Sequence, residues 1–561
     1  MEFLPALFLV ALVTPSDQQK ITLNQGQILG TEEADETGSL YHAFRSIPYA
    51  QSPTGDLRFK DPVPAKGWDG VRDGSLTPPL CPQLDLALYH AGKKVIRGQE
   101  DCLYLNVFTP KDSHTKLPVM VWIHEGAFVV GGASHLSPGP LVSRGVVLVT
   151  LHYRLGTLGF LSTEDSVLPG NLGLKDQTLA LRWVKDNIRD LGGDPEKVTV
   201  FGVSSGAAAA HFQVLTPYAK GLFHRAILQS GSGLCSWGSR ADHREVAVKV
   251  GQLVNCSKAG STTESLDSGT LLACLQKTPL EELVAVPQAF AIWSNEPLVM
   301  LPRVDGDFLP DFPANLLKNN RYNKVDLIAG VTAHEGAFVA KFLYARKPLR
   351  DALVTNFSVV GPLVMNFRNQ DDHDDHDPLY LARRVFYHYL GDILIADENA
   401  DAVTELFSDR LFKTCTEDTL KAHLEATHSR AYFYTLTHRG QKGFLDGLNL
   451  TVGAHWVSHT DDKQYLWDDT LQHPADQMVQ HLMTRMWTSF ASSGNPTPDS
   501  SLGFKWQPVS KDSLHFLDIR PAADMAPDGR ARVRAFWASL PTRQNKILYP
   551  ERFSSTSRPK C

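Results

Sequence analysis

The chain has 561 residues, of which 43% are hydrophobic and 21% charged, and it carries a formal net charge of −6. These proportions are ordinary for a folded globular protein. The mildly acidic balance argues against a broad basic face for nucleic acid or for an anionic membrane, so we expect neither as a partner.

The chain begins with an apolar run, Phe3 to Val13, which is followed by a polar stretch. A run of this length suits the hydrophobic part of a secretory signal peptide and is too short to span a bilayer. The acidic Glu2 is unusual ahead of such a run, and a buried N-terminal strand is the alternative interpretation. We predict a signal peptide over residues 1–16 and a single domain over residues 17–561 in a secreted, extracellular protein.

The chain contains seven cysteines, which indicates an oxidising compartment. Four of them bracket polar, loop-like stretches in two pairs, Cys81 with Cys102 and Cys256 with Cys274. Spacing alone does not determine which cysteines are bonded to each other. Of the remaining three, Cys235 and Cys415 are expected to be unpaired or buried thiols, and the terminal Cys561 is a candidate for a disulfide between two chains.

Three Asn-X-Ser/Thr sequons, at Asn255, Asn356 and Asn449, fit a glycosylated secreted protein. Such triplets also arise by chance, so each one alone is weak evidence. Together with the leader and the cysteines, they favour an extracellular glycoprotein.

Several short apolar runs predict strands that are buried on both faces of a sheet. They are Leu117–Ile123, Val146–Leu151, Val198–Phe201, Ala226–Leu228, Val325–Ala329 and Ala431–Leu436. Between them lie helix-like stretches such as Asp176–Asp190. Alternation of strands and helices predicts an α/β fold with a large, mostly parallel sheet covered by helices on both faces.

The loop after the first of these strands is rich in small residues. It reads His124-Glu-Gly-Ala-Phe128, and small residues let the backbone approach a substrate carbonyl oxygen. The backbone N–H groups of Gly126 and Ala127 are therefore candidate donors for an oxyanion hole.

A second motif follows the strand Val198–Phe201. Gly202-Val-Ser-Ser-Gly206 matches the G-x-S-x-G pattern, and the helix-forming run Ala207–Ala210 comes directly after it. Strand, sharp turn and helix in this order are typical of a nucleophile elbow, with Ser204 as the nucleophile. The N–H of Ser205 then becomes a third oxyanion donor. A serine in an ordinary structural turn is the alternative.

A nucleophilic serine needs a base, and the base needs an acid that orients it. Glu335 comes shortly after the strand Val325–Ala329 and precedes a glycine. His459 lies in a polar loop after the strand Ala431–Leu436, although His455 is a nearby competitor. The order Ser, Glu, His is the order found in α/β hydrolases.

The segment Asn369–Asp377 is a conspicuous polar cluster. His373 and His376 stand there among aspartates, a composition that can bind a divalent metal. A solvated loop is the preferred interpretation. We expect no metal and no cofactor.

Several segments, taken together and in order, resemble the type-B carboxylesterase family, which includes the cholinesterases and the insect esterases. The similarity extends over nearly the whole chain after the leader, and some segments look arthropod-like. The segments that carry it are Ser46–Phe59, Glu100–Val107, Tyr153–Phe160, Gly170–Gln177 and Leu191–Gly202.

The resemblance implies an α/β-hydrolase fold and a triad of Ser204, Glu335 and His459. His459 is preferred over His455 because His-Thr-Asp-Asp matches the family pattern. The resemblance also implies the disulfides Cys81–Cys102 and Cys256–Cys274, and it places Trp237 in the acyl pocket.

The chain departs from the family pattern at two positions. Val203 stands where the family commonly has glutamate in Gly-Glu-Ser-Ala-Gly, which removes a negative charge near the histidine. Glu125 stands where the family usually has the first glycine of the oxyanion loop. It either distorts that loop and slows catalysis, serves a special substrate or deacylation, or has no effect.

The sequence thus predicts a secreted serine carboxylic-ester hydrolase that acts on a small-molecule ester. A juvenile-hormone-type esterase is one alternative, although that subgroup typically has Gly-Gln-Ser-Ala-Gly. A binding or adhesion protein that has lost catalysis is another. The segment between Cys81 and Cys102 contains no tryptophan to hold a quaternary ammonium, which argues against a cholinesterase.

Overall fold

The computed structural model describes residues 19–112, 115–134, 136–367, 377–426, 429–448 and 450–554. The predicted signal peptide, Asn449, Cys561, and His373 with His376 lie outside these ranges. Among the described residues, no helix is both long and apolar enough to cross a membrane.

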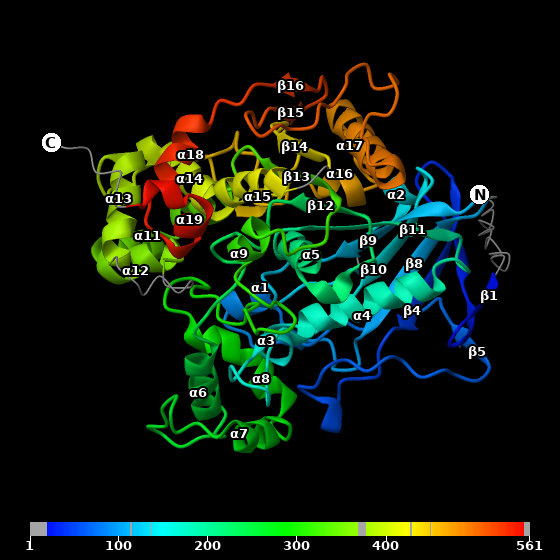
Figure 1. Cartoon of the computed structure of the whole chain (residues 1–561), viewed down its shortest axis with the longest axis horizontal. Helices are drawn as coiled ribbons and strands as arrows, with labels where there is room; N and C mark the ends of the chain where they lie inside the picture. The colour runs from blue at the N-terminus through cyan, green and yellow to red at the C-terminus, as the bar shows by residue number, and fades with distance from the viewer. Residues whose placement is uncertain are drawn as a thin grey trace, which may run out of the picture.

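A mixed sheet of eleven strands forms the centre of the described part of the chain (Figure 1). The strands from β10 through β9, β11, β12, β13 and β14 to β15 run parallel, and antiparallel strands complete both edges. In spatial order they are β16 (Asp524–Ala526), β15 (Phe516–Ile519), β14 (Ala431–Leu436), β13 (Asp326–Thr332), β12 (Arg225–Gln229), β11 (Gly193–Val203), β9 (Leu117–Ile123), β10 (Val147–Leu151), β8 (Tyr104–Pro110), β4 (Leu40–Pro48) and β3 (Thr31–Ala34).

Two small sheets lie outside this one. They consist of β1 (Lys20–Leu23), β2 (Gly26–Leu29) and β5 (Val71–Asp73), and of β6 (Gln83–Leu84) and β7 (Ile96–Arg97).

Side chains of alternate strand residues enter separate cores because successive residues of a strand point to opposite faces. In β9, Val119 and Val121 belong to the larger hydrophobic cluster, whereas Met120 and Trp122 belong to the smaller one. All four are fully buried. A strand with both faces covered must be apolar throughout, which is the pattern that predicted it.

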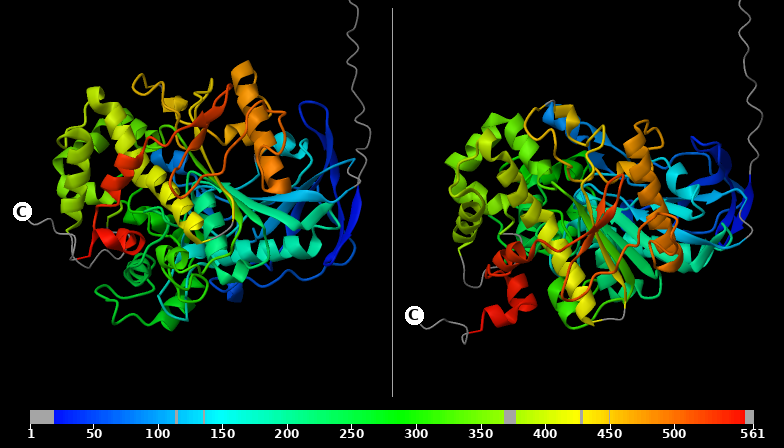
Figure 2. Two further views of the ribbon diagram at one scale, coloured as in Figure 1. Left: turned by 45° about the horizontal axis from the view of Figure 1, so that its top comes forward. Right: turned by 90° about the horizontal axis from the view of Figure 1, so that it is seen from above.

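Helices cover both faces of the sheet (Figures 1 and 2). α4 (Leu172–Asn187), α5 (Ser205–Leu215) and α15 (Thr414–Ala426) contact the central strands on one face. α2 (Gly139–Val142), α16 (Gln464–Trp467) and α17 (Pro474–Ser493) form the layer on the other face. The expected α/β architecture is confirmed.

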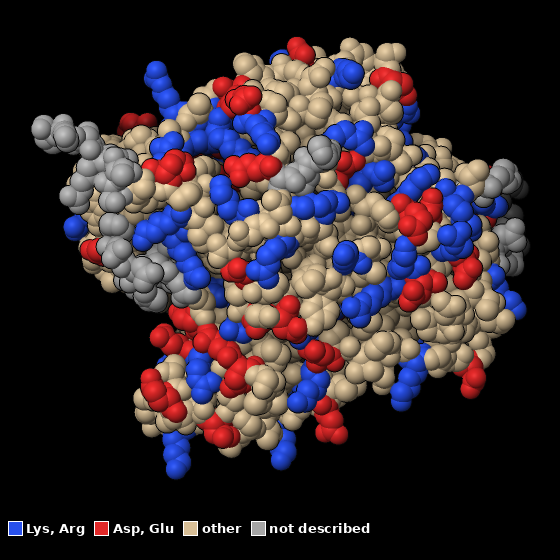
Figure 3. Space-filling view, viewed as in Figure 1, with Lys and Arg blue, Asp and Glu red and all other residues tan. Residues whose placement is uncertain are grey.

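The remaining helices surround this core. In Figure 1, α6 to α8 lie below the sheet, and α11 to α14 lie at one end of it. Their bounds are α1 Leu86–His90, α3 Gly156–Phe160, α6 His243–Leu253, α7 Ser268–Leu275, α8 Leu280–Ala285, α9 Pro313–Lys318, α10 Ala337–Ala345, α11 Lys347–Thr355, α12 Phe357–Val364, α13 Pro378–Leu390, α14 Ala400–Ser408, α18 Ala531–Trp537 and α19 Arg543–Leu548. Positive and negative side chains are interspersed over the face shown in Figure 3.

Three disulfides connect loops and helices of the described chain. Two of them join Cys81 to Cys102 and Cys256 to Cys274. The third joins Cys235 to Cys415, so the expectation of two unpaired thiols was wrong. These two cysteines are 180 residues apart, and no local pattern relates them. Their disulfide ties the segment after β12 to the start of α15.

A pair of buried histidines connects α5 to α15. The Nε2 atoms of His211 and His423 are 3.4 Å apart, and both residues are buried. Burial lowers the pKa of His423 from 6.5 to about 3 and holds the pKa of His211 well below its ordinary value. Both rings are therefore neutral at neutral pH.

This burial predicts that acid destabilises the fold. Below pH 6.5 the unfolded chain takes up protons at these rings that the folded chain does not accept, so stability is lost as the pH falls. For a pKa lowered from 6.5 to about 3, the loss at pH 5 relative to pH 7 is about 2 kcal/mol. His423→Phe should therefore reduce the pH dependence of the free energy of unfolding, measured by urea titration at both pH values, by about 2 kcal/mol. The same substitution at the exposed His473 is the control, and an unchanged pH dependence in His423→Phe would contradict this prediction.

Candidate active site

Ser204 occupies the sharp turn between β11 and α5. Its φ of 57° and ψ of −126° lie in a backbone region that non-glycine residues rarely adopt. The glycines on either side have no room for a side chain. A Cβ at Gly202 would lie 2.6 Å from the carbonyl carbon of Gly206, and one at Gly206 would lie 2.1 Å from the carbonyl oxygen of Ile123. The strand, sharp turn and helix expected from the motif are present.

Glu335 is fully buried just beyond β13, and its two carboxylate oxygens have different partners. Oε1 accepts hydrogen bonds from the Ser230 hydroxyl at 2.5 Å and from the Thr332 N–H at 2.7 Å. Oε2 lies 2.7 Å from Nδ1 of His459. Because an ionised carboxylate only accepts, Nδ1 carries the proton of the neutral imidazole, which leaves Nε2 able to act as a base.

The loop of His459 is fastened to the loop of Glu335 by backbone and ring contacts. The N–H of His334 donates to the Val457 carbonyl at 2.9 Å, and the N–H of Val457 donates to Nδ1 of His334 at 3.1 Å. The rings of Phe412 and Phe338 pack on His459 with centroid distances of 4.2 and 5.4 Å. These contacts fix the imidazole in one orientation.

The loop after β9 has the backbone shape that its small residues suggested. Gly126, Ala127 and Phe128 have φ angles of 120°, 54° and 61°. A Cβ at Gly126 would lie 1.9 Å from the carbonyl oxygen of Val130, so this position requires glycine. Within the described ranges, the N–H groups of Gly126, Ala127 and Ser205 have no hydrogen-bond acceptor. They remain available to a ligand.

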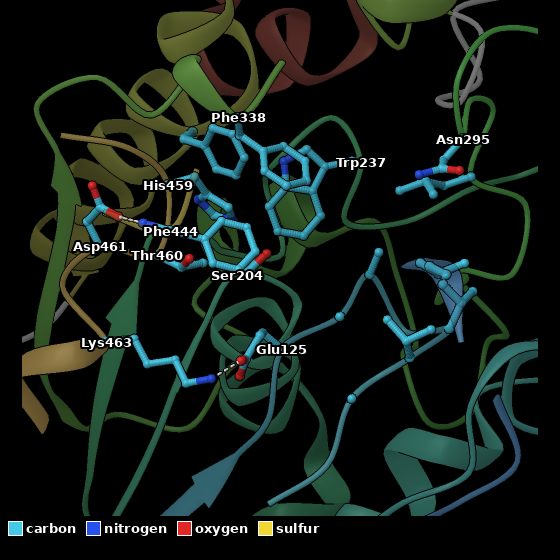
Figure 4. A pocket seen from close by; sticks show the side chains of 18 of the residues that line it. Glu125, Ser204, Trp237, Asn295, Phe338, Phe444, His459, Thr460, Asp461 and Lys463 are labelled. Carbon is cyan, nitrogen blue, oxygen red and sulfur yellow. Dashed lines mark hydrogen bonds and ion pairs between the residues drawn. The ribbon is translucent and has the colours of Figure 1, made fainter. Parts of the chain in front are cut away.

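Glu125 is accommodated without left-handed backbone strain, because it is not among the described residues with positive φ. The positive φ angles of this loop lie at the three residues that follow it, Gly126, Ala127 and Phe128. The side chain of Glu125 forms an ion pair with Lys463 (Figure 4). Its carbonyl oxygen accepts a hydrogen bond from Nδ1 of His124 at 2.9 Å. Burial lowers the pKa of His124 to about 4, so this ring is neutral.

Val203 lies in the smaller hydrophobic cluster and is fully buried. A buried acidic side chain near the histidine is that of Asp462, whose Oδ2 accepts hydrogen bonds from Gln229 at 2.9 Å and from Tyr434 at 2.7 Å. Burial raises the pKa of Asp462, while these two hydrogen bonds and the neighbouring His459 oppose the rise.

A cavity of about 900 Å³ brings the candidate residues together. Ser204, His459 and Trp237 all line it, and so do Glu125 and Lys463 (Figure 4). The indole N–H of Trp237 donates to the Leu411 carbonyl at 2.7 Å, which holds the ring against the wall. Leu411 and Phe412 lie in a π-helical turn, Asp409–Lys413. His455 is not among the lining residues.

The chain matches the model of the carboxylesterase family over residues 17–537. The chain belongs to the carboxylesterase family. Members of this family are ester hydrolases with the α/β-hydrolase fold, so family membership confirms both the predicted fold class and the predicted enzyme class.

Relatives within the family come from insects and mammals. Venom carboxylesterase-6 of Apis mellifera is 31% identical over 94% of this chain and 95% of its own length. The carboxylic ester hydrolase of Bombus ignitus is 31% identical over 97% of this chain and 98% of its own length. The juvenile hormone esterase of Tribolium castaneum is 33% identical over 88% of this chain and 87% of its own length.

Sequence reasoning missed two residues that shape this candidate site. Ser230 donates a hydrogen bond to Glu335, and Phe412 packs on the imidazole of His459. Ser230 directly follows β12 and so lies at the same sheet edge as Ser204. Its position at the end of a predicted strand is a sequence signal that could have identified it. Phe412 has no such signal, because it comes from a helical segment remote in sequence.

Proposed function

We propose that the protein is a serine carboxylic-ester hydrolase that forms an acyl-enzyme on Ser204. The observation that supports this most strongly is the hydrogen bond between Glu335 and His459 in a cavity that Ser204 also lines. A buried acid, an oriented imidazole and a strained serine at the end of a strand are the parts that this chemistry requires.

In the proposed acylation, Nε2 of His459 takes the proton of the Ser204 hydroxyl while the serine oxygen attacks the ester carbonyl. The negative charge on the former carbonyl oxygen is stabilised by the N–H groups of Gly126, Ala127 and Ser205. The alcohol then leaves with the proton from His459, and the acyl group remains on Ser204.

Deacylation follows the same proton path in reverse. His459 removes a proton from water, the resulting hydroxide attacks the acyl-enzyme, and Ser204 recovers its proton as the acid leaves. Throughout both steps Glu335 keeps Nδ1 protonated and stabilises the imidazolium. The cycle uses only groups of this chain and water.

Two further features belong to the proposal. Trp237, with Leu411 and Phe412, is assigned to the wall that receives the acyl group. Secretion is supported by the apolar leader and by the three disulfides, and the exposed Asn255 and Asn356 are accessible for glycosylation.

A fluorophosphonate probe and a panel of p-nitrophenyl esters test this function. We expect covalent labelling that maps to Ser204 by peptide mass spectrometry, and turnover of at least one ester. Juvenile hormone, added to the panel, tests the narrower activity named for the Tribolium relative. Absence of both labelling and turnover would favour the alternative of a binding protein on the same fold.

A further inference from the structure

An exposed aromatic ring lies at the substrate cavity. Phe444 belongs to the connection between β14 and α16, and it lines the cavity together with Ser204 and His459. Its side chain is 64% exposed, the largest fraction among the exposed large hydrophobic residues of the described chain. In the view of Figure 4, the ring of His459 lies between the rings of Phe444 and Phe338. Phe444 therefore presents apolar surface to a molecule that enters the cavity.

The backbone that carries this ring is fastened to the histidine loop. The N–H of Phe444 donates to Oδ1 of Asp461 at 2.7 Å, and Oδ2 of the same carboxylate accepts from the N–H of Ser458 at 2.7 Å. Ser458 directly precedes His459, and Asp461 is buried. One buried carboxylate thus binds both segments and holds the backbone of Phe444 in a fixed place beside the histidine loop.

The direction of proton transfer decides which part of an ester meets this ring. In the proposed acylation, Nε2 of His459 must reach the oxygen of the leaving alcohol to protonate it. The alcohol part therefore lies on the His459 side of the reacting carbon, whereas the acyl group is assigned to the wall of Trp237. A chain on the alcohol oxygen leaves the catalytic centre past the residues around His459, where Phe444 is held.

A phenyl ring favours apolar groups over polar ones. A ligand that covers the ring removes apolar surface of both molecules from water, which is favourable in proportion to the area. A polar chain of the same length would lose water without gaining a hydrogen bond. A cationic chain would gain only the weak cation–π attraction of an exposed ring. A methyl group extends a single carbon beyond the ester oxygen and offers little surface to cover the ring.

We propose that Phe444 forms an alcohol subsite that makes the enzyme selective for esters of bulky apolar alcohols, such as arylalkyl alcohols. This proposal rests on the proposed function, because it assigns the alcohol side of the same acylation reaction. Phe338 extends the apolar surface beside the histidine. Its side chain is 38% exposed, and its ring packs against the imidazole with a centroid distance of 5.4 Å.

Three esters separate the alcohol side from the acyl side. Methyl butanoate is the reference, 3-phenylpropyl butanoate carries a phenyl group on the alcohol, and methyl 4-phenylbutanoate carries it on the acid. Each kcat/KM value is divided by the rate constant for hydrolysis by hydroxide, which removes differences in intrinsic reactivity. We expect the parent enzyme to prefer 3-phenylpropyl butanoate over methyl butanoate by about tenfold or more, because about 50 Å² of apolar surface leaves water.

Variants of Phe444 should lose this preference. Phe444→Ala removes the ring and should lower the preference about tenfold, whereas Phe444→Leu keeps part of the apolar surface and should lower it about threefold. Both should keep the parent ratio of methyl 4-phenylbutanoate to methyl butanoate, a ratio that a general distortion of the site would change. Tyr387→Ala is the matched control, because it removes a ring of α13 that is 54% exposed and is not among the residues that line the cavity. It should keep both ratios.

Labelling of Ser204 by the fluorophosphonate probe shows that a variant is folded with a working nucleophile. A parent enzyme without preference for the bulky alcohol, or a labelled Phe444→Ala enzyme that keeps the parent preference, would overturn the alcohol subsite and leave the proposed hydrolysis intact. A change of the acyl ratio alone would place the ring on the acyl side and would overturn it as well. A parent protein that hydrolyses none of the esters and takes no label would overturn both proposals.

Discussion

Ser204→Ala is expected to lower kcat for any ester that the protein hydrolyses by a factor on the order of 10⁶. The loss is this large because alanine offers no oxygen to attack the carbonyl, and the remaining oxyanion donors only assist attack by water. The buried Glu335–His459 pair should persist, because none of its hydrogen bonds involves Ser204. The variant should therefore keep its fold and its ability to bind substrate.

The measurement is turnover of a p-nitrophenyl ester together with fluorophosphonate labelling of the folded protein. Ser493→Ala, at the exposed end of α17, is the matched control and should keep both. Ester hydrolysis by Ser204→Ala at more than about one-hundredth of the parent rate would assign the nucleophile to another residue.

Glu335→Gln is expected to lower kcat by about 10⁴-fold. The hydrogen bonds at this site determine which way the new amide faces. The Ser230 hydroxyl and the Thr332 N–H both donate to Oε1, so the amide oxygen must take that position. The amide NH₂ group then points at Nδ1 of His459, where it can only donate. His459 is driven into the tautomer with the proton on Nε2, which cannot accept the proton of Ser204.

The pre-steady-state rate of acylation measures this effect directly. Glu335→Asp keeps a carboxylate and should lose less activity, whereas Glu551→Gln on the exposed C-terminal turn should lose none. A Glu335→Gln enzyme whose acylation rate is within about tenfold of the parent rate would show that the carboxylate does not act through the histidine tautomer.

Local sequence pattern was sufficient for the strands that carry the site. Each of the six predicted strands overlaps an observed strand, because a parallel strand with both faces covered must be apolar along its length. Five strands of the sheet were missed, namely β3, β4, β8, β15 and β16. The first three and β16 lie in the antiparallel edges, where β3 and β16 keep partly exposed residues and lack a continuous apolar run. The short β15 pairs parallel with β14, but it alternates half-buried and buried residues.

The sequence also determined the elbow. Gly202 and Gly206 leave no room for a side chain, and their spacing around Ser204 is readable in a single short segment. Backbone conformation over a few residues depends mainly on the residues themselves, and this is why the motif was informative.

Only the tertiary structure decided which distant side chains meet. His459 and Glu335 are 124 residues apart, Lys463 and Glu125 are 338 apart, and Cys235 and Cys415 are 180 apart. The sequence contains many histidines, lysines and acidic residues, and their local sequence does not show which of them form such contacts. Their selection depends on how the strand ends and the surrounding helices pack, and residues far apart in the chain are brought together only by that packing.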